Sequence, residues 1–351
     1  MKVIMIGSHL RVTGGITRVV KNYLQAGIKE KVDLTYLPTY YGSNIVVNSM
    51  YYLVRYLDLF LKLNVFQKRY DVAHIHMSYK GSFIRKMHLI NLLSKRNVPV
   101  ILHMHGSQFK DYFNGSTEDK KEQIKNTLNK VSTIIALGKE WKEFYQSISN
   151  TNVVSLDNAV FPKENNDKTE EREYITTMGV LSQRKGTYDL IKAVKKLDGV
   201  IDSKYQFLIA GDGEISKVKE EISKLGLEQR IIIPGWISDQ DKINDIYNRS
   251  ILYVLPSYNE GMPMSILEAM SYGLPVISTN VGSIPSVLKE ENGIIIKPGD
   301  TDNLANSIKE LLDDKQKILN YREKNTTLIN TKYNVYKSID RLFELYQDAS
   351  K

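Results

Sequence analysis

The chain has 351 residues, 42% of them hydrophobic and 25% charged, which is typical of folded proteins and is long enough for two domains of ordinary size. It contains no cysteine, which excludes disulfides and thiolate metal sites and favours a reduced compartment. The N-terminal apolar run is too short for a signal peptide, and no apolar stretch approaches the roughly 20 residues that span a bilayer, so we expect a cytoplasmic protein or one peripheral on the inner face of the cell membrane.

The positive charge is concentrated in the first half. Residues 1–162 contain 22 Lys and Arg against 11 Asp and Glu, a net charge of +11, whereas residues 163–351 contain 26 against 29, a net charge of −3. This asymmetry predicts that the first half meets something anionic: a nucleic acid, an anionic membrane surface or a lipid diphosphate. Because zinc-finger, basic-zipper and RNP motifs are absent, we expect no nucleic-acid partner.

The first element is a short strand, Lys2 to Ile6, followed by a glycine-containing loop over residues 7–16 and then a helical pattern. A phosphate-binding turn requires this order, because glycines such as Gly14 and Gly15 let backbone N–H groups approach an anion. The G-x-G-x-x-G spacing of dinucleotide sites is missing. A flexible turn without a ligand is the alternative.

Residues 50–63 are apolar almost all round a predicted helix. A core helix of the first domain is the simpler interpretation. The Tyr, Arg and Lys residues in and after this segment would also suit contact with a membrane interface, and we keep that alternative.

Two predicted strands, residues 71–78 and 98–106, each end in a pair of histidines. The period of two places His74 and His76, and likewise His103 and His105, on one face of a sheet. Four histidines could bind a metal, but no carboxylate accompanies them at ligand spacing, so we expect no metal.

Residues 163–173 are polar without periodicity and predict a linker between a first domain, residues 1–162, and a second, residues 174–330. Strands and helices alternate again from Tyr174. Arg184 and Lys185 precede a predicted helix and form a natural diphosphate clamp, with solvated loop cations as the alternative. Asp239 and Asp241 spell D-x-D, but helix capping explains them better than metal binding.

Residues 256–277, Pro-Ser-Tyr-Asn-Glu-Gly-Met-Pro-Met-Ser-Ile-Leu-Glu-Ala-Met-Ser-Tyr-Gly-Leu-Pro-Val-Ile, predict a loop, a short helix and a buried strand. Pro263 suits the first helical turn, and Gly273 followed by Pro275 marks the end. Glu260 precedes the helix, and Glu268 lies inside it. A helix N-terminus readily holds a phosphate, although carboxylates near a helix start also occur simply because they complement the helix dipole.

The whole string closely resembles the E-x7-E motif of retaining GT-B glycosyltransferases, the large glycosyltransferase family 4 or "glycosyl transferases group 1", of the bacterial surface-polysaccharide type. The resemblance implies that Glu260 contacts the donor sugar, that Gly261, Met262, Pro263, Met264 and Ser265 bind sugar hydroxyls and diphosphate through the backbone, and that Glu268 holds the ribose. It further places Gly14 and Gly15 beside the diphosphate, His105 near the reacting sugar, Lys185 on the diphosphate, and Gly235 and Trp236 at the base. The family usually carries an arginine where this chain has Val180; this departure removes one expected phosphate contact, which we expect Arg184 to replace in part.

The alternation of elements predicts an α/β protein with two open parallel sheets, and the resemblance implies the GT-B fold: two Rossmann-like domains facing across a deep cleft, with a C-terminal helix, residues 331–351, crossing back to the first domain. We expect a retaining, metal-independent enzyme with no cofactor. It would move a sugar from a nucleotide-diphosphate donor, a UDP-sugar, to a glycan or lipid-diphosphate-linked acceptor in capsule, exopolysaccharide or other surface-glycan assembly. The alternatives are a nucleotide-sugar epimerase on the same fold and a catalytically silent accessory subunit.

Overall fold

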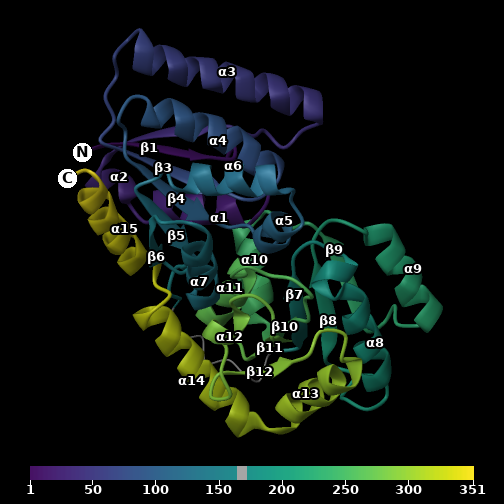
Figure 1. Ribbon diagram of the computed structural model, residues 1–351. Coiled ribbons are helices and arrows are strands. Elements are labelled where there is room, and N and C mark those ends of the chain that lie inside the picture. Colours follow the sequence, from purple (N-terminus) through teal and green to yellow (C-terminus); the bar gives the residue numbers. More distant parts are fainter. Residues whose placement is uncertain (164–171) are drawn as a thin grey trace. The chain divides into compact units, whose positions relative to one another are not determined.

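The computed structural model describes residues 1–163 and 172–351, so the predicted linker at residues 163–173 lies largely outside the described residues (Figure 1). The chain divides into two compact units. The first unit comprises residues 1–159 together with 335–351, and the second unit comprises residues 160–334.

The first unit contains a parallel six-stranded sheet in the order β2-β1-β3-β4-β5-β6. β3, β4 and β5 are buried along their whole length, as expected for strands that helices cover on both faces. The strands are β1 (Lys2–Gly7), β2 (Asp33–Pro38), β3 (Val72–Met77), β4 (Val100–Met104), β5 (Thr133–Ala136) and β6 (Asn152–Ser155). The helices are α1 (Gly15–Gln25), α2 (Ile28–Lys31), α3 (Ile45–Asn64), α4 (Gly81–Ser94), α5 (Phe109–Asn114), α6 (Glu118–Leu128), α7 (Lys139–Ile148) and α15 (Val335–Ala349).

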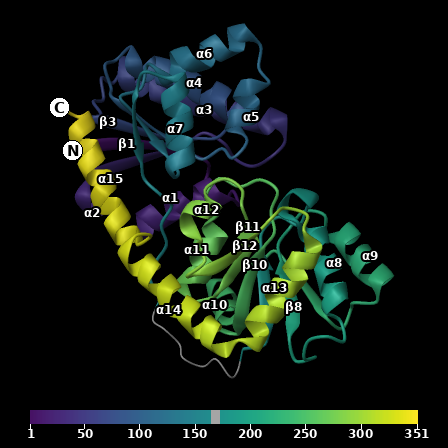
Figure 2. The same cartoon turned by 60° about the horizontal axis from the view of Figure 1, so that its bottom comes forward.

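The C-terminal helix α15 belongs to the first unit, although the second unit precedes it in the chain. It contacts α1 and β4, and both views place it along that side of the first unit (Figures 1 and 2). Leu342 and Tyr346 are fully buried in this contact. The first sheet is therefore covered in part by the last residues of the chain.

The helix α3 differs from the core helix that residues 50–63 predicted. Within that stretch only Leu59 and Leu63 are buried. The reason is that α3 packs on α4 rather than on the sheet, with the Tyr52 hydroxyl donating to the Arg85 carbonyl at 2.9 Å. The opposite side of α3 has nothing from the described chain over it, and the simpler interpretation was wrong for that side.

The second unit contains another parallel six-stranded sheet, in the order β12-β11-β10-β7-β8-β9. Its strands are β7 (Tyr174–Met178), β8 (Gln206–Ala210), β9 (Ile231–Gly235), β10 (Ser250–Leu255), β11 (Val276–Thr279) and β12 (Gly293–Ile296). Its helices are the 3-10 helix η1 (Gln183–Lys185), α8 (Thr187–Leu197), α9 (Ile215–Leu225), α10 (Gln240–Asn248), α11 (Met264–Ser271), α12 (Ile284–Val287), α13 (Thr301–Asp313) and α14 (Lys315–Thr331).

Each sheet has one point at which the chain reverses its direction of travel across the sheet. In the second unit the chain runs from β7 to β8 and β9, then returns to β10 on the other side of β7. In the first unit this switch lies between β1 and β3. Open α/β sheets bind ligands outside the carboxyl ends of the strands at such switch points. The expected pair of parallel α/β sheets is confirmed, and the topology points to the loops after β1, β3, β7 and β10.

Among the described residues, no helix combines the length and the apolar character that crossing a bilayer requires.

Candidate active site

Lys185 and Glu260 meet at the switch point of the second unit. Lys185 ends η1 in the segment after β7, and Glu260 lies in the loop after β10. The Lys185 Nζ lies 2.5 Å from Glu260 Oε1, and the same oxygen accepts from the Ser257 hydroxyl at 2.8 Å. Glu260 is only 7% exposed and Lys185 17%. Two charged side chains that the sequence placed in one site are thus brought together across 75 residues.

The loop from Pro256 to Glu260 is fixed by close backbone packing. Gly186 has φ +70°, and a Cβ on it would lie 2.0 Å from the Pro256 carbonyl oxygen. Gly282 has φ +54°, and a Cβ there would lie 1.9 Å from the Glu260 carbonyl oxygen. Both positions therefore require glycine for conformation and for space. These two contacts hold the backbone that carries Glu260.

Arg184 is bound to the same loop. Its guanidinium donates to the Asn259 carbonyl at 2.9 Å, and its own carbonyl accepts from the Tyr258 N–H at 2.8 Å. Arg184 therefore connects η1 to the Glu260 loop through the backbone.

The helix α11 begins directly after this loop. Ser265, Glu268 and Tyr272 are partly exposed along it, whereas Ile266, Leu267 and Met270 are buried, which confirms the predicted division of its two sides. Pro263 is the N-cap residue with ψ 121°, one position before the first turn in which we expected it. Since proline has no N–H, the free donors of the first turn belong to Met264, Ser265 and Ile266.

The segment from Gly261 to Met264 can contact a ligand mainly through its backbone, because the side chains of Met262, Pro263 and Met264 are buried. The Gly261 carbonyl accepts from the Ser283 N–H at 2.8 Å. Tyr253 lies buried beneath this segment; its hydroxyl donates to the Met178 carbonyl at 3.2 Å. Burial raises the pKa of this phenol, and Ser265 is a further hydrogen-bond partner, so Tyr253 stays neutral and supports β7 against α11.

Gly235 and Trp236 follow at the carboxyl end of β9. Gly235 has φ +80° and ends the strand, and the Trp236 side chain is about half exposed. An exposed indole at a strand end is free to stack on a flat ring. The predicted D-x-D segment caps α10 instead: the Asp239 carboxylate accepts from the N–H groups of Asp241 and Lys242, which confirms the capping interpretation.

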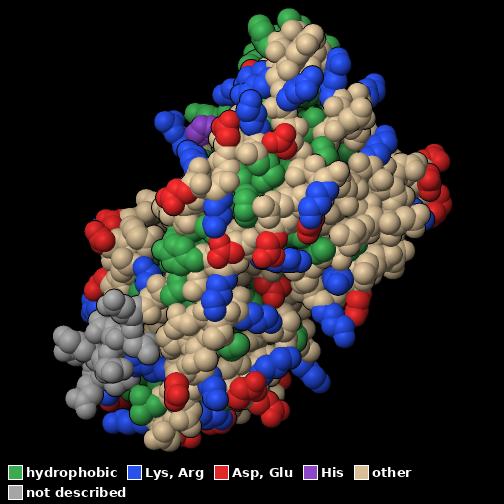
Figure 3. Space-filling model, turned by 90° about the vertical axis from the view of Figure 1, so that its left-hand side faces the viewer, with side chains coloured by type: hydrophobic (Ala, Val, Ile, Leu, Met, Phe, Trp, Pro, Cys, Tyr) green, Lys and Arg blue, Asp and Glu red, His purple; other side chains and the backbone are tan. Residues whose placement is uncertain are grey.

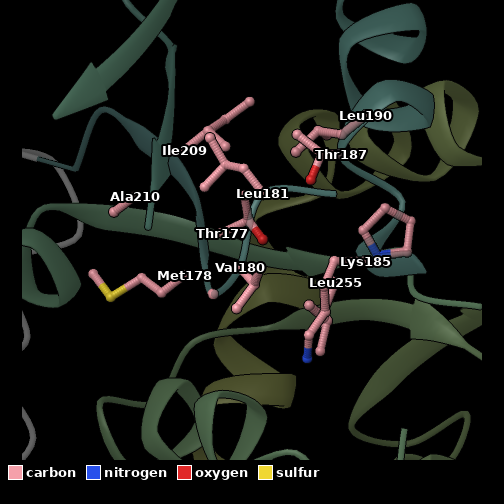
Figure 4. Close-up of a pocket in the computed structure, with 12 residues that line it drawn as sticks. Thr177, Met178, Val180, Leu181, Lys185, Thr187, Leu190, Ile209, Ala210 and Leu255 are labelled. Carbon is pink, nitrogen blue, oxygen red and sulfur yellow. The ribbon is translucent and has the colours of Figure 1, made fainter. Parts of the chain in front are cut away.

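A small pocket lies at the carboxyl ends of β7 and β8 (Figure 4). Most of its wall is apolar, and Lys185 is the charged residue among those that line it. Val180, where the family usually has arginine, also lines it. Arg184 does not line this pocket. The geometry therefore does not support the expectation that Arg184 replaces the arginine that the family usually has at the position of Val180. The residues are Thr177, Met178, Gly179, Val180, Leu181, Lys185, Thr187, Leu190, Ile209, Ala210, Leu255 and Pro256.

In the first unit, Gly14 and Gly15 lie where β1 gives way to α1. Gly14 is the N-cap residue of α1 with φ +141°. A Cβ on either glycine would meet no described atom within 4 Å, and both residues are exposed. The φ of Gly14 favours glycine at that position, whereas neither φ nor packing within the described chain requires glycine at Gly15.

Four histidines form a continuous array at the carboxyl ends of β3 and β4. The rings of His74 and His76 are 4.3 Å apart and those of His103 and His105 are 4.2 Å apart, so each pair shares a face as predicted. Hydrogen bonds cross between the two segments, one joining His74 Nε2 and His103 Nδ1 at 3.3 Å and one joining His76 Nδ1 and His105 Nε2 at 2.9 Å.

Burial keeps these rings neutral. It lowers the pKa of His74 to about 3, with a smaller contribution from His105, and it lowers the pKa of His105 to about 3 as well. Burial, followed by the neighbouring imidazoles, also holds the pKa values of His76 and His103 well below the usual range. A neutral His105 can donate or accept a hydrogen bond but is a weak base, which suits a positioning contact with a sugar hydroxyl better than proton abstraction.

Among the described residues, His74, His76 and His103 could hold a metal ion, since their ligand atoms lie within 4.8 Å of one another. Two of the ring nitrogens, His76 Nε2 and His103 Nε2, are buried without a hydrogen-bond partner in the described chain. His74, in contrast, is already engaged by the Tyr346 hydroxyl at 2.7 Å and by His103.

Sequence reasoning did not assign Ser257, Asn259 and Gly282, which fix Glu260 and its loop. The signal for Ser257 was its position three residues before Glu260. Gly282 lies more than twenty residues away and carries no local signal.

The geometry defines a Rossmann-like half that presents a carboxylate, a lysine and a helix N-terminus at one switch point. The comparisons with known proteins agree with this class. Residues 159–328 match the family model described as "Glycosyl transferases group 1". The UDP-Gal:alpha-D-GlcNAc-diphosphoundecaprenol alpha-1,3-galactosyltransferase of Escherichia coli is 28% identical over 92% of this chain and 85% of its own length. The N-acetyl-alpha-D-glucosaminyl L-malate synthase of Bacillus anthracis is 22% identical over 93% of this chain and 89% of its own.

The fold is shared with solved glycosyltransferase structures. HepE of Anabaena, in complex with UDP, superposes with a TM-score of 0.79 at 16% identity, covering 99% of this chain and 100% of that protein. The protein is a glycosyltransferase with the GT-B fold. Residues 159–328 match the family of glycosyl transferases group 1, as the resemblance at residues 256–277 implied.

Proposed function

We propose that this glycosyltransferase is a retaining, metal-independent enzyme that transfers a sugar from a UDP-sugar to a lipid-diphosphate-linked glycan. The product would serve the assembly of a capsule, an exopolysaccharide or another surface glycan at the inner face of the cell membrane. The observation that carries the donor half of this proposal is the meeting of Lys185 and Glu260 at the switch point of the second unit.

The donor would bind to the second unit. Its diphosphate fits the N–H groups of Met264 and Ser265 at the start of α11, with the Lys185 ammonium as counter-charge. Glu260 would accept hydrogen bonds from sugar hydroxyls, Glu268 from the ribose, and Trp236 would meet the base. As the bond between the sugar C1 and the diphosphate breaks, negative charge grows on the diphosphate, and these fixed donors would stabilise it.

The acceptor would bind to the first unit. The excess of Lys and Arg over Asp and Glu in residues 1–162 favours an anionic ligand. The Escherichia coli relative is named for an acceptor sugar on a diphosphate-linked polyprenol, which supports a lipid diphosphate. As the resemblance implies, Gly14 and Gly15 would lie beside the donor diphosphate, and neutral His105, hydrogen-bonded to His76, would hydrogen-bond a sugar hydroxyl.

The test is transfer by the purified chain from a panel of radiolabelled nucleotide sugars to a synthetic lipid-diphosphate sugar. We expect transfer from a UDP-sugar, with the anomeric configuration of the donor retained in the product. A charged hydrogen bond contributes about 1.5–3 kcal/mol, so Glu260→Ala should slow transfer by about ten- to a hundredfold or more. Glu260→Gln keeps the shape of the side chain and should lose activity similarly.

The matched control is Glu310→Gln, which removes an exposed carboxylate of the second unit that pairs with Lys317. It should leave transfer unchanged. Near-normal transfer by Glu260→Ala would refute the role of Glu260. Inversion at a ring carbon of the donor without transfer would indicate an epimerase, and neither transfer nor donor hydrolysis by the purified chain would indicate an accessory subunit.

A further inference from the structure

The helix α3 presents a continuous apolar face to solvent. At 100° per residue, eight of its residues fall within an arc of about 140°. Their side chains are between 40% and 65% exposed. We call them the α3 face: Val46, Val47, Met50, Leu53, Val54, Leu57, Phe60 and Leu61.

The opposite side of the helix fixes this orientation. Leu59 and Leu63 are buried against the first unit, and the Tyr52 hydroxyl bonds to the backbone of α4. The Asn44 side chain caps the N-terminus by accepting from the Val47 N–H at 2.9 Å. The α3 face is therefore the outer side of a docked helix. Contiguous exposed apolar surface of this kind marks an interaction site.

Cations border the α3 face. Lys68 and Arg69 follow the C-terminus of α3, and both are exposed. The single acid within α3 is Asp58, and Lys62 binds it at 2.8 Å. Figure 3 shows the same pattern at the upper end of the molecule, where α3 lies: hydrophobic side chains at the tip and Lys and Arg side chains below them.

We propose that the α3 face inserts into the headgroup and acyl boundary of an anionic lipid bilayer, with α3 parallel to the membrane plane. Apolar insertion and attraction of bordering cations to anionic lipids are the two contributions that together give stable peripheral binding. The role of this membrane contact rests on the proposed function: it would hold the enzyme at the bilayer surface, where a lipid-linked acceptor lies.

Charge decides between lipid and a second copy of the chain. In a contact between two copies through the α3 face, Lys68 and Arg69 would find no free acid on the facing helix, because Asp58, its only acid, is already paired with Lys62. An anionic membrane supplies the missing negative charge.

The experiment is co-sedimentation of the full chain with vesicles of phosphatidylglycerol and phosphatidylcholine, or of phosphatidylcholine alone. We expect binding to the anionic vesicles that weakens in high salt. Leu53→Gln combined with Leu57→Gln should lower the partition coefficient at least about tenfold, and Lys68→Glu combined with Arg69→Glu by a similar factor on anionic vesicles. Leu319→Gln is the matched control, an exposed leucine on α14 in the second unit, and should bind like the wild type.

Two results would overturn the proposal. One is unchanged vesicle binding by the Leu53→Gln, Leu57→Gln variant. The other is a wild-type dimer in sedimentation velocity that this variant abolishes, without vesicle binding, which would make the α3 face a contact between copies. The variant should keep the wild-type melting temperature and transfer to a short-chain, water-soluble acceptor. Wild-type vesicle binding without any transfer would leave the membrane contact standing and refute the proposed function instead.

Discussion

The Lys185 ammonium and the Glu260 carboxylate form an ion pair, Nζ to Oε1 at 2.5 Å, with the Ser257 hydroxyl on the same oxygen. We proposed different contacts for these two side chains, the diphosphate for Lys185 and the sugar for Glu260. Without a donor, each therefore holds the other in place. This pairing keeps two buried charges satisfied until a ligand replaces part of it.

Replacing Lys185 should weaken donor binding without unfolding the protein. In Lys185→Met we expect the dissociation constant for UDP to rise at least about tenfold, because a charge-assisted hydrogen bond to phosphate contributes roughly 1.5–3 kcal/mol. Isothermal titration calorimetry measures this. Lys195→Met, which removes an exposed lysine of α8 in the same unit, is the control and should bind UDP normally. If both variants bound UDP with equal affinity, Lys185 would not contact the donor.

The close approach of Gly186 to the Glu260 loop can be tested with a pair of alanine variants. Gly186 and Gly199 have nearly the same φ, +70° and +74°, but only Gly186 would place a Cβ against the Pro256 carbonyl, whereas Gly199 has no described atom within 4 Å. Gly199→Ala should lose about 1 kcal/mol of stability from backbone strain. Gly186→Ala should lose clearly more, and transfer with it. Chemical denaturation of both variants gives the comparison, and equal losses would contradict it.

The histidine array should make the first unit sensitive to acid. The pKa of His74 is about 3 in the folded protein against 6.5 ordinarily, so between these pH values the unfolded chain binds more protons. Stability is unaffected above pH 6.5 and falls as the pH drops through this window, by about 1.4 kcal/mol per pH unit for each such histidine. Hydrogen exchange of the β3 and β4 amides at several pH values measures the slope.

His74→Gln should reduce that slope by about 1.4 kcal/mol per pH unit, since glutamine does not titrate. His88→Gln, which changes an exposed histidine of α4, should leave it unaltered. If the two variants have the same slope as the wild type, the buried histidines do not govern the acid response.

Lys86 is a second buried titratable group of the first unit, 2% exposed on α4. Burial, together with the Arg85 guanidinium, lowers its pKa from 10.5 to about 7. Between these values the unfolded chain binds more protons, so wild-type stability rises with pH across the window. Lys86→Met should therefore stabilise the protein near pH 7, by at most ~5 kcal/mol, with a gain that shrinks towards pH 10. Thermal melts across this range, with Lys95→Met as the exposed control, would contradict this if the gain were independent of pH.

Local signals predicted α11 and its surroundings well. Pro263 lies one residue before the helix and Gly273 two residues after it, and the division of its sides follows from the helical period. The alternation of strands and helices likewise predicted both sheets, because parallel strands covered on both faces are continuous apolar runs.

The remaining features depend on contacts between distant residues. A helix that is hydrophobic all round, such as α3, can be buried in the core or can dock on the protein by one side and expose the other. The sequence pattern is the same in both cases, because it does not show which surfaces pack against the helix. The hydrogen bond from Arg184 to the Asn259 carbonyl and the approach of Gly282 to Glu260 each join segments that are far apart in sequence. No periodicity records such contacts.

The return of α15 to the first unit also bears on how the protein is made. The second unit is continuous, residues 160–334, and can complete its sheet and core as soon as those residues leave the ribosome. The first unit is discontinuous: its sheet is synthesised early, yet Tyr346, the hydroxyl partner of His74, is translated only after the whole second unit. Because domains generally fold as units during synthesis, the unit that begins the chain is the one that finishes folding last. Messages truncated shortly before residue 335 would therefore yield a folded second unit attached to an incomplete first unit.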